Sequence, residues 1–109
     1  MKKNPQTDRE GNKIWRNKKG QLHRTDGPAT IYKDGSKVWY QNDKCHRTDG
    51  PAIIYNDGSK FWYQNNKRHR IDGPAVMWKD GREYWYINGK EIDPIPKHIC
   101  YWRKKLDEE

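Results

Sequence analysis

HRTDGPATIYKDGSKVWYQNDK, at residues 23–44, is the first of three similar copies of one stretch of the chain. The second copy, HRTDGPAIIYNDGSKFWYQNNK, occupies residues 46–67, and the third, HRIDGPAVMWKDGREYWYINGK, occupies residues 69–90, so the period is 23 residues. A partial copy, EGNKIWRNKKGQLHR, begins at Glu10, and the pattern stops after Lys90. Self-similarity at a fixed period indicates a repeat architecture.

Each copy is expected to form two β-strands, in the first copy at about residues 29–33 and 36–41. Asp34 and Gly35 lie between them, and Asp-Gly between apolar runs favours a two-residue type I′ turn with positive φ at both centres. The longer connection, from Asn42 to about Pro51, contains Asp-Gly-Pro, which breaks strands. We expect its aspartates to cap backbone N–H groups and its glycines to supply positive φ. These residues are Asp26, Asp49, Asp72, Gly27, Gly50 and Gly73.

A two-residue turn places residue 31 opposite residue 38, and residue 30 opposite residue 39. Side chains alternate between the faces of a strand. One face of the first hairpin is then expected to carry Ala29, Ile31, Val38 and Tyr40, and the other Thr30, Tyr32, Lys37 and Trp39. Both faces hold large apolar groups, so one is the core and the other shows a row of aromatic rings with basic neighbours.

The predicted fold is therefore all-β, an elongated antiparallel sheet of stacked hairpin repeats over residues 10–92, after a polar segment at residues 1–9. Beyond it, Ile95, Ile99, Trp102 and Leu106 recur at helical spacing. Residues 93–109 are thus predicted to form a short amphipathic helix that caps the open end of the stack.

The composition is polar yet rich in aromatic residues. Of 109 residues, 31% are hydrophobic and 35% charged, but six Trp, seven Tyr and one Phe make up 13%. Each such ring can bury ~150–250 Å², which suffices to hold a thin sheet together. The net charge of +8 favours acidic partners, although a charge of this size also serves solubility alone.

The string W-Y-x-N-x-K-x-H-R-x-D-G-P-A-x-x-Y-x-D-G resembles the MORN repeat over residues 10–92. The shared features are the aromatic pair, the turn at residues 88–90, the histidine and the final Asp-Gly. This resemblance implies a curved antiparallel sheet that serves as an interaction or assembly module, in some proteins with lipid binding. The MORN unit has glycines where this chain has Arg24 and Asp26 and their counterparts. The H-R-x-D-G-P-A form is similar to variant repeats in short proteins of bacteriophages, which implies a viral protein acting on a host component.

No catalytic, cofactor-binding or metal-ligating set is predicted, so the protein is not expected to be an enzyme. Ser36 and Ser59 each follow an Asp-Gly turn, where small polar residues are ordinary. The histidines at 23, 46 and 69 form a ladder whose rungs lie ~10 Å apart in a sheet. A shared zinc ion needs each nitrogen within ~2.0–2.1 Å, so adjacent rungs cannot hold one.

Candidate partner-binding residues form two ladders. The arginines, with an aspartate two positions later, either form an ion-pair network within the loops or grip carboxylates and phosphates. The aromatic rings either stack between rungs as core or form an open binding face, because Trp, Tyr and Arg are enriched at binding hot spots. The predicted set is Trp39, Trp62, Trp85, Tyr32, Tyr55, Trp78, Arg24, Arg47 and Arg70.

The leading functional prediction is a protein-protein interaction module, an inhibitor or adaptor from a phage, whose protein partner has an acidic surface. The alternative is nucleic-acid or nucleotide binding through a basic, aromatic-lined face. The N-terminal residues lack the apolar core of a signal peptide, and no apolar run is long enough for a membrane span. A cytoplasmic protein with both cysteines, Cys45 and Cys100, as free thiols is expected.

Overall fold

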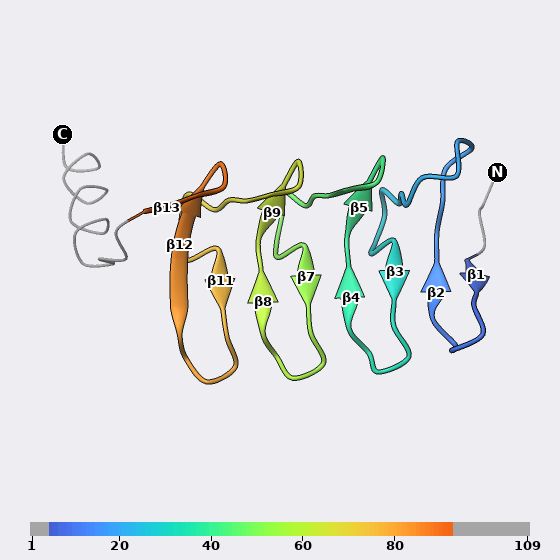
Figure 1. Ribbon diagram of the computed structural model, residues 1–109, viewed down its shortest axis with the longest axis horizontal. Coiled ribbons are helices and arrows are strands. Elements are labelled where there is room, and N and C mark those ends of the chain that lie inside the picture. Colours follow the sequence, from blue (N-terminus) through green and yellow to red (C-terminus); the bar gives the residue numbers. More distant parts are fainter. Residues whose placement is uncertain (1–4, 93–109) are drawn as a thin grey trace.

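The computed structural model describes residues 5–92, and most of their strands form one long antiparallel sheet (Figure 1). The strand order in the sheet is β1-β2-β3-β4-β7-β8-β11-β12-β13, so neighbours in sequence are neighbours in space. No helix occurs among these residues, and hence none that could cross a membrane. The strands are β1 (Gln6–Thr7), β2 (Lys13–Ile14), β3 (Thr30–Ile31), β4 (Lys37–Val38), β7 (Ile53–Ile54), β8 (Lys60–Phe61), β11 (Val76–Met77), β12 (Glu83–Ile87) and β13 (Lys90–Ile92).

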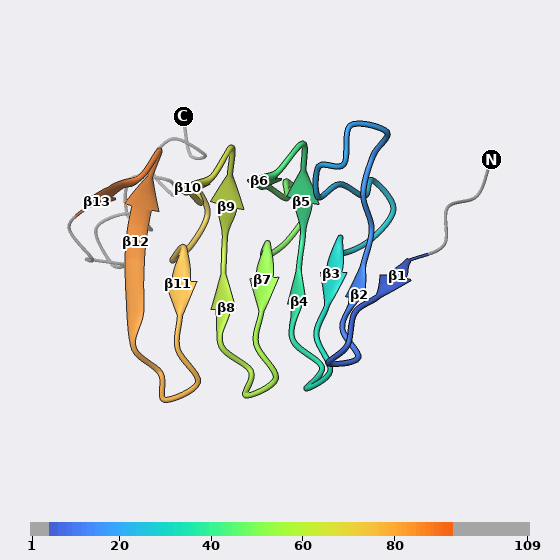
Figure 2. The ribbon, with the colours of Figure 1, turned by 45° about the vertical axis from the view of Figure 1, so that its right-hand side comes forward.

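The predicted all-β, elongated sheet of hairpin repeats is confirmed. The radius of gyration is 16.3 Å, against ~13 Å for a compact domain of about this length. Figures 1 and 2 show the strands side by side across the long axis. Strand β1 extends the sheet into the segment predicted as a polar N-terminus. The predicted capping helix, residues 93–109, lies outside the described residues.

The Asp-Gly turn is longer by one residue than predicted. The N–H of Tyr32 donates to the carbonyl of Ser36, which leaves three loop residues, and only Gly35 among them has positive φ (96°). The Asp34 carboxylate accepts the Ser36 N–H at 2.9 Å. A three-residue loop of this kind is a turn closed by a glycine bulge. The predicted two-residue type I′ turn is therefore wrong at this place.

One extra loop residue moves the register and changes which residues share a face. Thr30 pairs with Val38 and Ile31 with Lys37, instead of the predicted 30–39 and 31–38 pairs. A shift of one residue exchanges the faces of one strand relative to the other. The predicted grouping of Ile31 with Val38 is thus wrong, because Val38 faces the same side as Thr30.

Type I′ turns occur instead in the connection predicted to be a long loop. Asn42 and Asp43 have φ of 51° and 67°, and they join β5 (Tyr40–Gln41) to β6 (Lys44–Cys45). The next repeat has the same hairpin, from β9 (Tyr63–Gln64) to β10 (Lys67–Arg68), with positive φ at Asn65 and Asn66. Asn and Asp tolerate this left-handed backbone better than other non-glycine residues. Each repeat thus carries two hairpins.

The hydrophobic row of the sheet follows from the observed register. Cross-strand neighbours on one face are all uncharged and mostly apolar, and Val38, Phe61 and Val76 among them are buried. Cys45 is buried beside this row, and burial raises the pKa of its thiol to about 12. The row runs Ile14, Thr30, Val38, Ile53, Phe61, Val76 and Tyr84.

The other face carries a row in which tryptophans alternate with alanines. The N–H of Trp39 donates to the carbonyl of Ala52, and the N–H of Ala52 to that of Phe61, so Ala52 lies between Trp39 and Trp62. Ala29, Ala52 and Ala75 are each 0% exposed. An alanine fits this position because a large ring stands on either side of it. We call this side the tryptophan face and the other the tyrosine face.

Candidate binding surface

The tyrosine face carries two rows of aromatic rings on either side of the hydrophobic row. One row, near the Asp-Gly loops, consists of Tyr32, Tyr55 and Trp78. The second, near the type I′ turns, consists of Tyr40, Tyr63 and Tyr86. Members of each row are 23 residues apart in sequence. One period adds two strands to the sheet, so neighbouring rings of a row lie ~10 Å apart. We call the strip of the tyrosine face between these two rows the trough.

The first row is the most exposed aromatic surface of the described residues. Tyr32, Tyr55 and Trp78 have 39%, 42% and 37% of their surface exposed. All three were predicted as partner-binding residues. Phe61 supports two of them from the floor, because its ring meets Tyr55 and Trp78 edge-on, with centroids 5.5 and 5.1 Å away. The rings are thus held in place while one side of each stays open.

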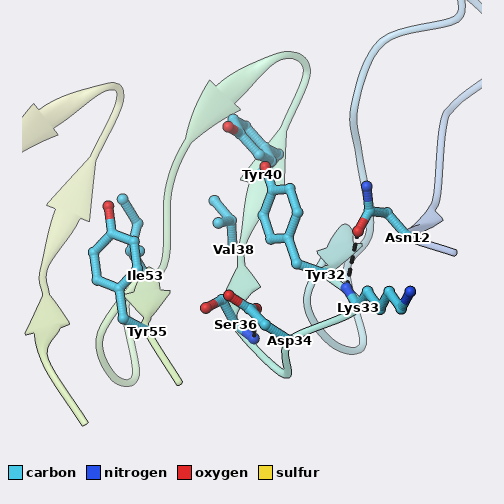
Figure 3. A pocket seen from close by; sticks show the side chains of 9 residues that line it. All are labelled: Asn12, Tyr32, Lys33, Asp34, Ser36, Val38, Tyr40, Ile53 and Tyr55. Carbon is cyan, nitrogen blue, oxygen red and sulfur yellow. Dashed lines mark hydrogen bonds between the residues drawn. The ribbon is translucent and has the colours of Figure 1, made fainter. Parts of the chain in front are cut away.

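A groove of about 530 Å³ opens between the first two rungs (Figure 3). Val38 and Ile53 line its floor, and the rings of Tyr32, Tyr40 and Tyr55 stand around it. Burial raises the pKa of the Tyr40 phenol, with smaller contributions from Tyr32, Cys45 and Tyr55 nearby. The groove is therefore apolar at its base and bordered by phenol hydroxyls.

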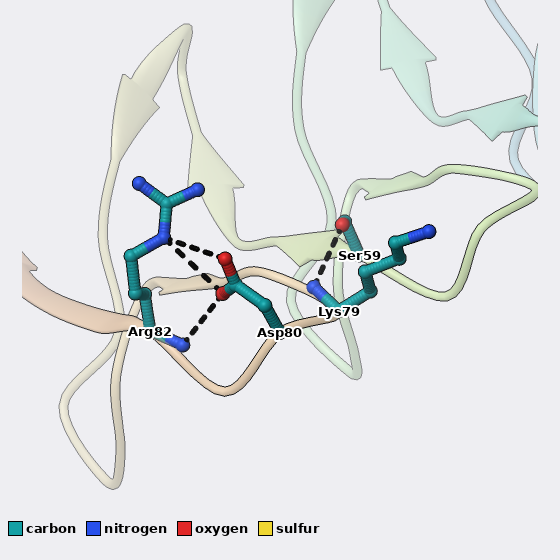
Figure 4. A network of polar contacts seen from close by, with 4 residues as sticks. All are labelled: Ser59, Lys79, Asp80 and Arg82. Carbon is teal, nitrogen blue, oxygen red and sulfur yellow. Dashed lines mark hydrogen bonds and ion pairs between the residues drawn. The ribbon is translucent and has the colours of Figure 1, made fainter.

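Hydrogen bonds between successive Asp-Gly loops hold the first row in line. The Ser59 Oγ, whose residue is 1% exposed, accepts the N–H of Lys79 in the next loop at 3.0 Å (Figure 4). Ser36 makes the same bond to Asn56, and the Asn12 side chain makes it to Lys33. Each loop is tied to the one before it, so the spacing of the exposed rings is set by the backbone.

On the tryptophan face, each arginine of the H-R-x-D-G-P loop covers an indole ring. The guanidinium carbons of Arg47 and Arg70 lie 3.9 Å from the ring centres of Trp39 and Trp62. Arg24 covers Trp15 at the same distance. The structure thus brings predicted arginines into contact with predicted tryptophans, Arg47 with Trp39 and Arg70 with Trp62. The rings of Trp39 and Trp62 are half-buried, and Trp85 is 6% exposed.

Each arginine is fixed by its own loop. The Nε of Arg47 donates to the Asp49 carboxylate at 2.9 Å, and its Nη1 donates to the Pro51 carbonyl at 3.0 Å. The hydrogen bond from Arg47 lowers the pKa of Asp49. The same contacts recur for Arg24 and Arg70. The aspartates thus orient the arginines. Of the two expected roles for this ladder, the ion-pair network within the loops is present.

The glycines of these loops serve a purpose other than the predicted one. None of Gly27, Gly50 and Gly73 has positive φ. A Cβ built on Gly50 would lie 2.9 Å from the Arg47 guanidinium carbon, and one on Gly73 2.6 Å from that of Arg70. Glycine is needed because the guanidinium lies against its backbone, between the glycine and the indole.

The histidine ladder has a structural task. The Nδ1 atoms of His23, His46 and His69 accept backbone N–H groups of Asn42, Asn65 and Asn88 at 3.0–3.1 Å, at the start of each type I′ turn. Within residues 5–92, no three His, Cys, Asp or Glu side chains gather in a way that could hold a metal ion.

Several residues of the tyrosine face were not predicted as site residues. Tyr40 was only grouped with Ala29, Ile31 and Val38 on one face, and Tyr63, Tyr86 and Arg68 were not singled out. Arg68 donates to the hydroxyls of both Tyr63 and Tyr86 and lies 5.1 Å from the Tyr86 ring centre. The residue type after Asp-Gly gives no signal for this loop, because its closing acceptor is a backbone carbonyl, that of Ser36 in the first repeat and that of Arg82 in the third.

Comparison with known proteins adds no relative. No protein-family model matches the chain, and neither a curated protein nor a solved structure matches it significantly. The resemblance to the MORN repeat therefore stays a prediction from the residues.

Proposed function

We propose that the protein is a non-enzymatic interaction module that holds a partner protein against the tyrosine face. The observation that carries this proposal is the row of Tyr32, Tyr55 and Trp78, each more than a third exposed and one repeat apart. Singly scattered exposed apolar residues are normal on protein surfaces. A row at a fixed period is different, because it offers one continuous strip to a partner.

The chemistry of the strip also favours a protein partner. Tyr and Trp combine a large apolar area with a polar group and are enriched among the residues that dominate binding energy. The rings of Tyr55 and Trp78 are held edge-on against Phe61, so little ordering of these two is left for the moment of binding. The arginines and tryptophans of the opposite face are instead stacked against each other within the protein.

The mode of action proposed is inhibition by occlusion. The similarity of the H-R-x-D-G-P-A repeats to variants in short bacteriophage proteins supports a host protein as the target, in the bacterial cytoplasm. The net charge of +8 supports an acidic surface on that partner.

Nucleic-acid binding is the second candidate, and one observation favours it. On the tryptophan face, Lys13, Lys37 and Lys60 alternate with apolar residues along a single cross-strand row. All three lysines are exposed. Such a row can follow a phosphate backbone. It ends at Glu83, where the third repeat has a carboxylate, and it lies on the face opposite the exposed tyrosines.

Photo-crosslinking from the two faces tests the proposal. Benzoylphenylalanine replaces Tyr55 in one variant and Lys60 in another, and each is irradiated in bacterial lysate with and without nuclease. We expect nuclease-resistant crosslinks to a protein from position 55. Crosslinks only from position 60 that disappear with nuclease support the second candidate, and none from either position contradicts both.

Truncation of the central ring measures its share of the binding energy. Removing a hot-spot aromatic costs ~2 kcal/mol or more, so Tyr55→Ala should weaken binding of the crosslinked partner by roughly thirtyfold. The matched control is Lys60→Ala, an exposed residue of the same hairpin on the other face, which should change the dissociation constant little. Equal losses in the two variants would refute the assignment of the tyrosine face.

A further inference from the structure

We propose that the segment bound by the tyrosine face is a polyproline II peptide, with a proline at every third residue and acidic residues between the prolines. The inference rests on the proposed function and names its partner class. The peptide would lie along the trough, across the strands, with one proline at each rung.

The spacing of the rungs agrees with the pitch of such a peptide. Tyr32, Tyr55 and Trp78 recur every two strands, and strands in a sheet lie ~4.7–4.9 Å apart, so the rings repeat about every 10 Å. A polyproline II helix has three residues per turn and rises ~3.1 Å per residue, hence about 9 Å per turn. Every third side chain therefore meets the next ring of the row. The floor beneath it changes along the row, from Val38 and Ile53 between Tyr32 and Tyr55 to the Phe61 ring between Tyr55 and Trp78.

The shape of the trough suits proline rings. The groove between the first two rungs has an aliphatic floor, Val38 and Ile53, between the rings of Tyr32, Tyr40 and Tyr55. Grooves lined by aromatic residues are the recognised docking surface for this kind of peptide. A pyrrolidine ring is compact, apolar and rigid, so it enters such a site with little loss of conformational entropy.

The trough also offers donors for the peptide backbone. A polyproline II helix has no internal hydrogen bonds, so its carbonyls need outside donors. Among residues 5–92, the hydroxyls of Tyr32 and Tyr55 have no hydrogen-bond partner, whereas those of Tyr63 and Tyr86 accept from Arg68. The free hydroxyls stand at the groove, one repeat apart.

Charge complementarity selects acidic residues between the prolines. Lys33 borders the groove and Arg68 lies on the second aromatic row, and neither forms an ion pair within residues 5–92. The Asp34 carboxylate also lines the groove, and it and the Asp57 carboxylate accept N–H groups of their own turns. These unpaired cations attract a peptide carboxylate, whereas the lysine row that would suit nucleic acid lies on the other face.

Two peptides of one composition test the register. Fluorescein-labelled PEDPEDPEDP has prolines at every third residue, and PEPDEDPEPD has the same residues with uneven spacing. Fluorescence anisotropy with the full-length protein should show at least about tenfold tighter binding of the first peptide. Equal affinities, or no binding of the first peptide, would overturn the proposal.

Variants link the binding to the trough. Tyr55→Ala should weaken the evenly spaced peptide by about tenfold or more, and Tyr55→Phe, which keeps the ring and removes the donor, by a few-fold. Lys60→Ala should leave its affinity unchanged, and circular dichroism checks that each variant is folded. If only Lys60→Ala weakens peptide binding, the peptide does not bind in the trough. The same follows if an oligothymidylate competes with the peptide and binds more tightly than it does. Crosslinking of a protein from position 55 with no peptide preference would refute this inference alone and leave the proposed function standing.

Discussion

At the scale of single residues, the arginine of each repeat is a packing residue as much as a charge. Arg47 lies between the Trp39 ring and the backbone of Gly50, and Asp49 and the Pro51 carbonyl fix its orientation. A cation–π contact contributes ~0.5–1 kcal/mol at exposed sites and more where it is desolvated. An exposed ion pair contributes less than about 1 kcal/mol. The flat contact on the indole therefore contributes about as much as the ion pair.

We predict that Gly50→Ala destabilises the protein by about 0.5–1.5 kcal/mol, because the displaced guanidinium gives up its cation–π contact and part of its exposed ion pair. The new Cβ would meet the guanidinium at 2.9 Å and drive it off the indole. Urea unfolding measures the change. Thr48→Ala, an exposed residue of the same loop, is the control and should be close to neutral.

A double-mutant cycle tests the cause. If the alanine methyl group acts through Arg47, then Gly50→Ala should cost much less in the Arg47→Ala background. Additive costs would show that the glycine is required for some other reason.

The residue scale is where prediction from sequence was least complete. The pairing of each arginine with an aspartate two positions later was visible in the pattern, and the ion pairs are present. The position of the guanidinium was not visible, because it depends on which tryptophan the loop folds back upon. Positive φ was therefore assigned to Gly27, Gly50 and Gly73, where the requirement is space.

At the scale of elements, one loop residue decided the assignment of the faces. Asp-Gly is compatible with a two-residue type I′ turn and with a three-residue loop that ends in a glycine bulge. The predicted strands and their alternation were sound, but the observed register places Trp39 opposite Ala29, and Tyr32 then shares a face with Tyr40. The exposed ring positions Tyr32, Tyr55 and Trp78 were found, although their partners across the trough were not.

Loop-to-loop bonding leads to a prediction at this scale. Ser59→Ala removes the acceptor for the Lys79 N–H and should cost about 0.5–1.5 kcal/mol, the net value of one hydrogen bond. Amide exchange should quicken at Lys79 by roughly two- to tenfold, because ~1.4 kcal/mol corresponds to a factor of ten.

The exchange experiment carries its own controls. The Tyr55 N–H donates to the Ser59 carbonyl within its own hairpin, so its exchange should stay unchanged. Asn56→Ala, in the same loop and exposed, should alter neither rate. Equal acceleration at Lys79 and Tyr55 would indicate that the whole hairpin loosens and that the bond between loops is not the cause.

At the scale of the whole molecule, stability is built from contacts between neighbouring repeats. The strand order of the sheet follows the order of the sequence. The histidine bonds stay within one copy, whereas the bonds from the serines and from the type I′ turns reach the copy next along the chain. Repeat proteins of this kind gain stability as a sum over adjacent units. The 23-residue period predicted this organisation from sequence alone.

Removal of one full period tests that organisation. Deleting residues 46–68 joins Cys45 to His69, which restores the same local sequence, so the shortened protein should keep its β-sheet circular dichroism. It should also have a smaller radius of gyration by X-ray scattering and a smaller dependence of unfolding free energy on urea, since less surface is buried. Deleting residues 46–67 leaves one residue too many in the connection and should fold poorly. Similar stability of the two deletions would refute strict repeat register.

The single-layer sheet has a mechanical consequence. Its strands lie across the long axis, and the described chain begins at β1, at one end of that axis, and reaches β12 and β13 at the other (Figure 1). Backbone hydrogen bonds in an antiparallel sheet run perpendicular to the strands, and so along the line between these ends. A pulling force applied there stretches the bonds of one strand pair at a time, as in opening a zipper, and no two strands are sheared past each other. The molecule should therefore lengthen under modest tension in a series of small steps, and act as an extensible spacer.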